Sequence, residues 1–227
     1  MRPSSWSLPR CKWRETEDTV QNINAAPAAR RPWNKGKLVG PKPPLQPKHV
    51  WAIRTRLQMQ RKVRDLALFN LAIDSKLRGC DVVSLKVEDI APHGYAMERA
   101  TVRQKKTGRP VRFEITEQSR QSVDEYLRVC KSQPGSFLFG GRRGKEKSLT
   151  TRQYARLVST WTAMIGLDAS LFGTHSLRRT KATLIYCKTG NLRAIQLLLG
   201  HSKVESTVRY LGIEVDDALM IAEQVDI

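Results

Sequence analysis

Apolar residues recur at helical spacing along most of the chain after residue 46. The positions of Val50, Ile53 and Leu57 predict a helix that begins near Pro47, because residues three or four apart share one face of a helix. Residues 63–73 are apolar almost throughout, which predicts a second and largely buried helix. Further helical patterns follow at about 82–85, 116–131, 150–165, 175–188 and 192–199, with short helical pieces after them. Glycines are the expected helix stops, at Gly79, Gly166, Gly190 and Gly200.

Alternation replaces helical spacing between Glu98 and Ile115. This segment is rich in Val and Thr, and Thr107-Gly108-Arg109-Pro110 breaks it, which predicts a β-hairpin. The helix that follows is expected to bury Val123, Leu127 and Val129. A short apolar run, residues 137–139, precedes a loop rich in glycine and arginine. The pattern predicts a mainly α domain with one small antiparallel β-sheet, which is an α+β fold class.

Residues 1–46 differ from the rest of the chain. They contain seven prolines, several basic residues and almost no periodic apolar pattern. Such a segment cannot bury enough surface to offset its ordering entropy, so we expect a basic Pro-rich arm that is largely extended or disordered. One folded domain, residues 47–227, is expected after it. The stretch 30–37 could contact a DNA backbone, or it could be a solvated tail with Trp33 tucked onto the domain.

Charge sets the first constraint on function. The 40 Lys and Arg against 21 Asp and Glu give a net charge of +19 and a pI of about 10.3. This surplus favours a polyanion, because each cation that meets a phosphate releases a condensed counterion. A ribosomal type of RNA binder and a membrane-surface protein remain alternatives on charge alone.

Other residue types narrow the class of protein. The four cysteines form no CxxC pair, and the four histidines lack zinc-ligand spacing, so the sequence predicts no metal or other cofactor. No run approaches the ~20 apolar residues of a membrane span. The start of the chain has no apolar stretch of a signal peptide. We therefore expect a soluble, cytoplasmic protein that does not act at a membrane.

Three motifs in the carboxy-terminal half stand in one order. The segment Thr174-His175-Ser176-Leu177-Arg178-Arg179-Thr180 places His175 and Arg178 on one helical face. Leu199-Gly200-His201 ends 23 residues after Arg178, and Tyr210 follows nine residues later. Each motif alone is weak, since a lone tyrosine is usually a core ring. Together, in this order and spacing, they resemble the tyrosine recombinase (phage integrase) family and imply its catalytic-domain fold.

Two upstream features of the family are also matched. Its first arginine stands at the end of a buried helix with an acidic residue three positions later, and here Arg78 and Asp81 do so. The family places a lysine in a hairpin turn, often within Lys-Thr-Gly. Lys106 matches that position, although its neighbour Lys105 leaves the register open by one. The resemblance covers roughly residues 45–227.

Two departures from the family pattern stand near these motifs. Lys76 occupies a position where many members have glycine, and Ser176 one where many have aspartate. Neither removes a catalytic group.

The resemblance implies a role for each matched residue. Tyr210 is the nucleophile that attacks a DNA phosphate and forms a 3′-phosphotyrosyl link. The guanidinium groups of Arg78 and Arg178 suit the negative charge that develops on the phosphate, because arginine stays ionised and donates paired hydrogen bonds. The remaining roles are an additional hydrogen bond or proton acceptance for His175 and His201, protonation of the departing 5′-oxygen for Lys106, and orientation of Arg78 or a histidine for Asp81.

Each of these residues also has an ordinary interpretation. Arg78 alone could be a cation that complements a helix end. Lys106 could be a solvated turn residue, and His201 could cap the next helix. The joint pattern, rather than any one residue, favours the catalytic interpretation.

The family resemblance also implies partners. They are double-stranded DNA, a homotetramer that assembles on it and, optionally, an accessory DNA-bending protein, with the protein associated with the nucleoid. Residues 1–46 are too short and Pro-rich for the helical clamp domain that members usually carry, so the chain resembles single-domain invertases and small integrases of mobile elements. Residues after Tyr210 predict an amphipathic helix that docks on a neighbouring protomer or on its own core.

Two other functions stay open. A type IB topoisomerase uses a similar residue set but reseals the same strand. A non-catalytic DNA-binding regulator could keep the fold.

Overall fold

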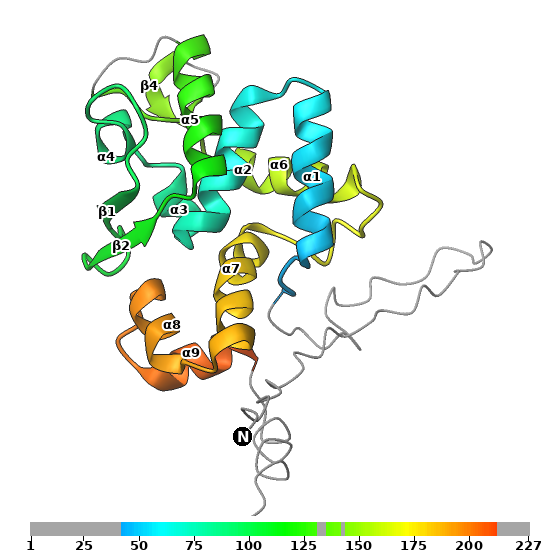
Figure 1. The fold of residues 1–227 in the computed structure, drawn as a ribbon, viewed down its shortest axis with the longest axis vertical. Coiled ribbons are helices and arrows are strands. Elements are labelled where there is room, and N and C mark those ends of the chain that lie inside the picture. The colour runs from blue at the N-terminus through cyan, green and yellow to red at the C-terminus, as the bar shows by residue number, and fades with distance from the viewer. Residues whose placement is uncertain (1–41, 131–134, 142–143, 213–227) are drawn as a thin grey trace, which may run out of the picture.

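The computed structural model describes residues 42–130, 135–141 and 144–212. Within these ranges, the chain forms a mainly helical domain with two small antiparallel hairpins (Figure 1). The helices are α1 (Pro47–Met59), α2 (Val63–Ser75), α3 (Gly79–Val82), α4 (Val87–Ile90), α5 (Glu117–Cys130), α6 (Thr151–Ala163), α7 (Thr174–Thr189), α8 (Leu192–Leu199) and α9 (Val204–Leu211). The strands are β1 (Arg99–Arg103), β2 (Pro110–Glu114), β3 (Gly140–Gly141) and β4 (Gly144–Ser148).

Helix α2 is the central element of the fold. Every residue from Leu66 to Ser75 is buried, as the nearly continuous apolar pattern predicts. The helix packs against α1, α5 and α7, and Phe69 meets the ring of Trp161 from α6 edge-on, with ring centroids 5.6 Å apart. Because α2 is surrounded on so many sides, its carboxy-terminal end has a well-defined position in the domain.

The end of α2 differs from the prediction that Gly79 stops it. The helix ends at Ser75, and Lys76 takes the left-handed conformation with φ 53°. Gly79 instead begins α3, directly after Arg78. A Cβ atom on Gly79 would stand 3.3 Å from the side chain of Thr174, so glycine allows α3 to approach the start of α7. A left-handed conformation usually favours glycine, and here a lysine adopts it.

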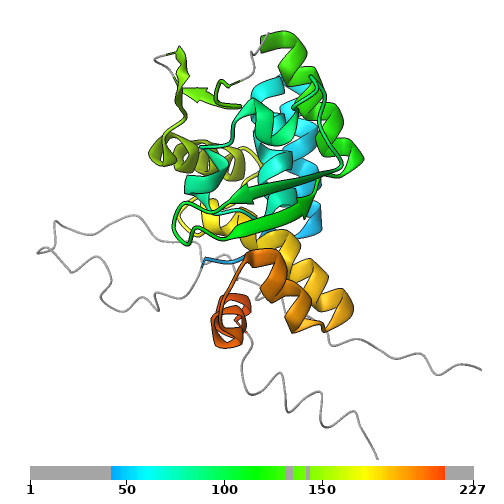
Figure 2. The same ribbon diagram turned by 90° about the vertical axis from the view of Figure 1, so that its left-hand side faces the viewer.

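The predicted hairpin is confirmed. Strands β1 and β2 pair antiparallel from Arg99 opposite Glu114 to Arg103 opposite Pro110. The turn is closed by the N–H of Gln104, which donates to Arg109, and by the N–H of Gly108, which donates to Gln104. Strand β2 also contacts α8, and Figure 2 shows the green hairpin directly above that orange helix. The turn that carries the candidate lysine therefore lies close to α8.

The predicted fold class, mainly α with a small antiparallel sheet, is confirmed, but β3 and β4 add a second small sheet that was not predicted. It follows the buried side chains of Leu138 and Phe139, whose backbones bond to Leu85 and Leu149. Glycine and basic residues have low strand propensity, so the sequence of this segment reads as a loop. The expected burial of Val129 in α5 is also wrong, since that side chain is 67% exposed.

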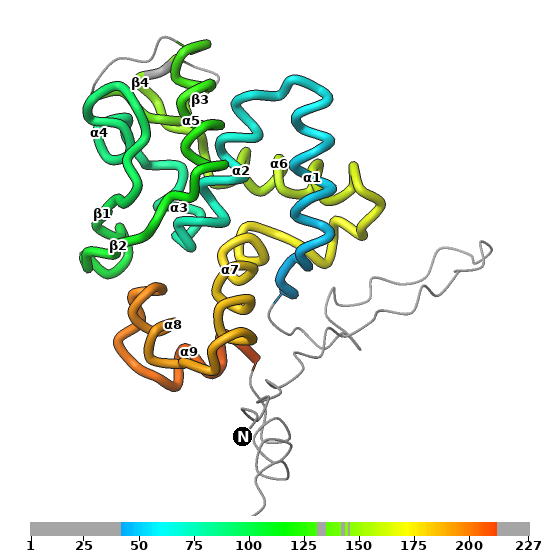
Figure 3. Tube along the Cα trace, viewed as in Figure 1, coloured from blue at the N-terminus to red at the C-terminus, as the bar shows by residue number. Residues whose placement is uncertain are grey.

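Helices α7, α8 and α9 bury a small apolar cluster of their own. Ala182, Ile195 and Leu199 form its centre, and Tyr210 packs partly against it. Figure 3 follows the chain from α7 through α8 to α9, beside the larger body formed by the earlier elements. The left-handed glycines Gly190, Gly200 and Gly212 end the three helices, two of them as predicted. Gly166, with φ +82°, comes three residues after the end of α6, whose C-cap is Met164.

Residues 42–46 pack onto the domain rather than extending from it. The side chain of Leu45 is fully buried, and its N–H donates to the hydroxyl of Thr180 in α7 at 3.0 Å. The ammonium of Lys42 donates to the carbonyl oxygens of Ser170 and Phe172. Residues 1–41 and the predicted helix after Tyr210, from 213 on, lie outside the described residues. None of the helices in the described ranges has both the length and the apolar character needed to cross a membrane.

Candidate active site

The guanidinium of Arg178 lies at the centre of the candidate site. It projects from the first turns of α7 and is 2% exposed. Its Nη2 atom donates to the carbonyl oxygen of Leu199 at 2.9 Å and lies 3.5 Å from Nε2 of His201. Its Nη1 atom is buried and has no hydrogen-bond partner among the described residues. A buried, unpartnered donor on a charged group costs free energy, so this N–H is suited to an anionic ligand.

Arg78 reaches the same carbonyl through one intermediate side chain. Its Nη1 donates a hydrogen bond to Oε1 of Gln104. Nε2 of Gln104 in turn donates to the carbonyl oxygen of Leu199 at 3.1 Å, beside the bond from Arg178. The two arginines, 100 positions apart in the sequence, are thus brought together at the end of α8. The sequence did not predict Gln104 as a site residue. The only feature that could have indicated it is its position just before the paired lysines of the turn.

His201 lies beside both Arg178 and the candidate nucleophile. Its Nδ1 lies 3.1 Å from the hydroxyl of Thr207, and its ring meets that of Tyr210 edge-on, with centroids 5.4 Å apart. Burial and the positive charges of Arg178 and Arg78 lower the pKa of His201 to about 4. The imidazole is therefore neutral near pH 7 and can accept a proton or a hydrogen bond.

Tyr210 projects from α9 into a positively charged environment. The guanidinium carbons of Arg178 and Arg179 lie 5.7 and 5.4 Å from the centroid of its ring. Its hydroxyl oxygen is buried, and no hydrogen bond of normal geometry reaches it from the described residues. Burial raises the pKa of Tyr210 to about 12, although the charges of Arg178, Arg179 and Arg78 oppose the shift. The phenol is thus protonated at neutral pH, and its reaction needs a base.

Arg179 was not a predicted site residue, yet it joins the site to the start of the described chain. Its Nη1 donates to the carbonyl oxygen of Lys42 at 2.9 Å, while its Nε is buried without a partner among the described residues. Burial lowers the pKa of Arg179, and the attraction to Tyr210 opposes this shift without cancelling it. The guanidinium lies beside Tyr210, so the backbone at Lys42 and the candidate nucleophile share a neighbour.

His175 lies on the exposed side of the same group. It stands one turn before Arg178, as the motif predicts. Partial burial, followed by the charges of Arg178, Arg78, Arg179 and Lys42, lowers its pKa. These cations gather around one small region, which favours an anion there.

Asp81 and the hairpin lysines lie at the edge of the site. The side chain of Asp81 is buried, and its Oδ1 accepts the backbone N–H of Lys105 at 2.8 Å. Both Lys105 and Lys106 have exposed side chains in the turn. The hydrogen bond that Asp81 accepts holds the hairpin turn, and it reaches neither Arg78 nor a histidine. The predicted role of Asp81 in orienting Arg78 or a histidine therefore stays a prediction. The choice between Lys105 and Lys106 also stays open.

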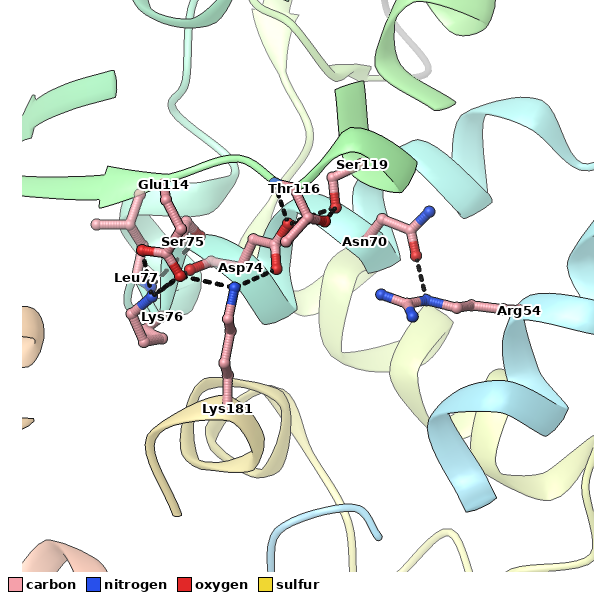
Figure 4. Close-up of polar contacts among 10 residues, drawn as sticks. All are labelled: Arg54, Asn70, Asp74, Ser75, Lys76, Leu77, Glu114, Thr116, Ser119 and Lys181. Carbon is pink, nitrogen blue, oxygen red and sulfur yellow. Dashed lines mark hydrogen bonds and ion pairs between the residues drawn. The ribbon is translucent and has the colours of Figure 1, made fainter. Parts of the chain in front are cut away.

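Four buried or half-buried charges hold together the elements that carry the site. The four-charge cluster consists of Asp74, Lys76, Glu114 and Lys181. The ammonium of Lys181, from α7, lies 2.7 Å from Asp74 and 2.6 Å from Glu114 (Figure 4). The fully buried ammonium of Lys76 lies 3.3 Å from Glu114 and donates to the backbone carbonyl of Asp74 at 2.6 Å. The cluster thereby connects the end of α2, which leads to Arg78, with β2 and α7.

The model of the phage integrase family matches residues 45–215, well over half of the chain. The chain belongs to the phage integrase family. The resemblance inferred from the motifs is therefore confirmed.

Curated members of the phage integrase family show the same relationship. The "Probable integrase/recombinase YoeC" of Bacillus subtilis (strain 168) is 31% identical over 160 residues, which cover 70% of this chain and 82% of that protein. The "Tyrosine recombinase XerC" of Neisseria gonorrhoeae is 29% identical over 189 residues, which cover 77% of this chain. The match spans only 59% of that XerC.

Solved structures of phage integrase relatives share the fold. The XerA recombinase superposes with a TM-score of 0.65 at 20% identity, covering 83% of this chain and 67% of that one. The XerH site-specific recombinase bound to difH substrate gives a TM-score of 0.62 at 18% identity, covering 82% and 55%. These matches confirm the predicted catalytic-domain fold.

Proposed function

We propose that this chain is a site-specific DNA recombinase that cleaves and rejoins strands through a 3′-phosphotyrosyl intermediate, without metal or ATP. The observation that carries the proposal is the buried guanidinium of Arg178 next to the buried hydroxyl of Tyr210, where Nη1 and the hydroxyl have no hydrogen bond of normal geometry within the described residues. A phosphate diester bound there would meet a cationic donor and a nucleophile together. Family membership and the charge of +19 support the same conclusion.

Charge stabilisation is assigned to the two arginines. As Tyr210 attacks, a second negative charge develops on the non-bridging oxygens of the phosphate. Arg78 and Arg178 each use one guanidinium nitrogen on a protein acceptor, which leaves further N–H groups for those oxygens. His175 adds a hydrogen bond from the exposed side. Such preorganised donors are usually the largest catalytic contribution.

Proton transfers complete the cleavage step. The bond from Oη of Tyr210 to phosphorus forms, and the bond from phosphorus to the 5′-oxygen breaks. The phenolic proton passes to His175 or His201, and the negative charge of the bound phosphate offsets the cations that lower the pKa of each imidazole. Lys106 protonates the departing 5′-oxygen, and Asp81 supports this through its bond to the neighbouring backbone of Lys105. The 5′-hydroxyl of the partner duplex then attacks the phosphotyrosine and reverses these steps.

The proposed partner is double-stranded DNA, on which four copies of the chain assemble. Related proteins have been solved on DNA, including XerH on its difH substrate and a lambda integrase dimer on a core site. We place this activity on nucleoid DNA in the cytoplasm, with an accessory DNA-bending protein as an optional partner. The basic stretch 30–37 is proposed to contact the DNA backbone.

Covalent attachment to DNA can be tested with a pool of random sequences, which requires no known DNA site. The protein is mixed with a pool of nicked duplexes with random central sequence, denatured in detergent, and the DNA that stays attached is recovered. We expect covalent adducts with the unaltered protein and with Tyr95→Phe, whose ring is 60% exposed. Tyr210→Phe should give none while still binding the recovered duplexes.

Three outcomes would contradict the proposal. Adducts formed by Tyr210→Phe would exclude Tyr210 as the nucleophile. No adducts with the unaltered protein would favour a non-catalytic regulator. Adducts together with relaxation of plasmids that lack the recovered site, and no exchange between duplexes that carry it, would favour a type IB topoisomerase.

A further inference from the structure

We propose that Gln104 is a positioning residue that holds both catalytic arginines through a single side-chain amide. The inference rests on the proposed function, since it concerns the same site. It adds a residue that lies outside the motifs of the catalytic set.

The amide of Gln104 has only one chemically consistent orientation. Arginine has no acceptor, so the atom that meets Nη1 of Arg78 must be the amide oxygen. That oxygen also accepts from the hydroxyl of Thr107 at 2.8 Å. The amide nitrogen therefore faces the carbonyl oxygen of Leu199, to which it donates at 3.1 Å. Because the side chain is 1% exposed, water does not compete for these bonds.

The carbonyl of Leu199 joins the two halves of the arrangement. A carbonyl oxygen has two lone pairs, and here one donor is Gln104 and the other is Nη2 of Arg178 at 2.9 Å. Hydrogen bonds thus run without a break from Arg78 through Gln104 and Leu199 to Arg178. The position of one guanidinium relative to the other depends on the amide between them.

The fold keeps the end of α8 close enough for this contact. Gly200 has φ +66°, and a Cβ atom there would stand 2.6 Å from Cγ2 of Val111 and 3.0 Å from Nε2 of Gln104. Glycine therefore permits the direct approach of α8 to the hairpin. Gln104 also opens the turn that carries Lys105 and Lys106, so its placement bears on the candidate acid too.

Loss of the amide should affect the chemical step more than DNA binding. Arg78 would lose its buried acceptor, and its guanidinium would no longer be held against that of Arg178. A misplacement of about 1 Å in a catalytic group costs about 100-fold in rate. We expect Gln104→Met, which is similar in length but makes no such bonds, to slow adduct formation about 10- to 100-fold, with DNA affinity within about threefold.

The experiment measures single-turnover adduct formation on a nicked duplex recovered from the random pool. The duplex is made twice, once with an ordinary scissile phosphate and once with a methylphosphonate, in which a methyl group replaces one charged oxygen. The neutral substrate develops less negative charge, so it depends less on the arginines. The factor by which Gln104→Met slows adduct formation should therefore be at least fivefold smaller on the methylphosphonate than on the phosphate. The same should hold for Arg78→Ala. Gln58→Met, at an exposed glutamine on α1, is the matched control.

A second variant guards against a folding defect. Gln104→Glu changes one group only, keeps an acceptor for Arg78 and places an oxygen against the carbonyl of Leu199. Gln104→Glu should form adducts more slowly than the unaltered protein on the phosphate substrate. Its rate should fall by a smaller factor on the methylphosphonate. Urea unfolding and circular dichroism check that each variant is folded.

The outcomes separate this inference from the proposed function. If the unaltered protein forms no adduct, the proposed function is contradicted and the role of Gln104 falls with it. If it forms adducts but folded Gln104→Met and Gln104→Glu react at the normal rate, or lose equally on both substrates, only the role of Gln104 is overturned.

Discussion

Replacement of Lys181 by methionine removes the cation that joins the carboxylates of Asp74 and Glu114. At 2.7 Å and an effective dielectric constant of about 20, the attraction to Asp74 is about 6 kcal/mol before the cost of desolvation. The carboxylate of Asp74 is 3% exposed, so it would stay buried without its partner. Loss of one member of a buried pair typically costs about 3–5 kcal/mol.

The lower end of that range applies here. Asp74 keeps hydrogen bonds from the N–H and hydroxyl of Thr116 and from the hydroxyl of Ser119. The bond of Lys181 to Glu114 adds little, because Glu114 is 41% exposed. We expect a loss of about 3 kcal/mol in the free energy of unfolding. With a urea slope of about 2 kcal/mol per M, the midpoint would fall by about 1.5 M.

Urea unfolding, followed by the fluorescence of buried Trp161, measures this change. A double-mutant cycle with Asp74→Asn isolates the pair, and we expect a coupling of about 2 kcal/mol. A loss below about 1 kcal/mol, or a cycle additive to within about 0.5 kcal/mol, would refute the reasoning.

The coupling should also depend on pH with a defined sign. Burial alone would raise the pKa of Asp74, but the charge of Lys181 and the hydrogen bonds from Lys181, Ser119 and Thr116 outweigh it and lower the pKa below 3.8. A carboxyl with a lowered pKa in the folded state stabilises the protein above its unfolded pKa, and this is lost as the pH falls through the folded value. The coupling should be flat from pH 5 to 8 and decline below about pH 4. A coupling that grows with acidification would contradict this.

Three further predictions concern the site and the packing around it. Gly200→Ala should lower the free energy of unfolding, measured by thermal melts, by about 2 kcal/mol or more, because the residue has a positive φ and its new Cβ would clash with Val111 in β2. Gly94→Ala is the control: Gly94 also has a positive φ, but nothing lies within 4 Å of its Cβ position, so the loss should be about 1 kcal/mol. Leu45→Ala should cost about 3 kcal/mol in urea unfolding and Leu197→Ala, which is 62% exposed, under about 0.5 kcal/mol; equal losses would mean that residues 42–46 do not belong to the core. Because the pKa of His201 is about 4, the cleavage rate should show no inflection near pH 6.5 from this residue, and an inflection that disappears in His201→Gln would contradict that.

Local patterns predicted the elements that depend on a single segment of the chain. The helices α1 and α2 and the β1–β2 hairpin follow from apolar spacing, and the family motifs pointed to Arg178 and His201, which lie beside the ring of Tyr210. The contacts between those residues could not be predicted in the same way. The link from Gln104 to Leu199 depends on how the hairpin docks on α8, which no local pattern specifies.

The stop of α2 was misjudged for a similar reason. Glycine is the usual left-handed residue at a helix end, so the sequence predicts a stop at Gly79. The ammonium of Lys76 is instead held by Glu114 and by the carbonyl of Asp74, which supports a conformation that lysine rarely adopts. The second sheet was missed because β4 pairs through backbone groups of a glycine- and lysine-containing segment with little strand propensity.

The small apolar cluster of α7, α8 and α9 implies that the molecule does not open uniformly. Regions with few buried apolar contacts exchange their amide protons through local opening, at a lower free energy than global unfolding. Amides of α9 should therefore exchange with solvent deuterium well before those of α2, where ten successive residues are buried. The helix that carries Tyr210 can then shift or detach while the central helix stays folded, so motion of the nucleophile is thermodynamically separate from the integrity of the domain.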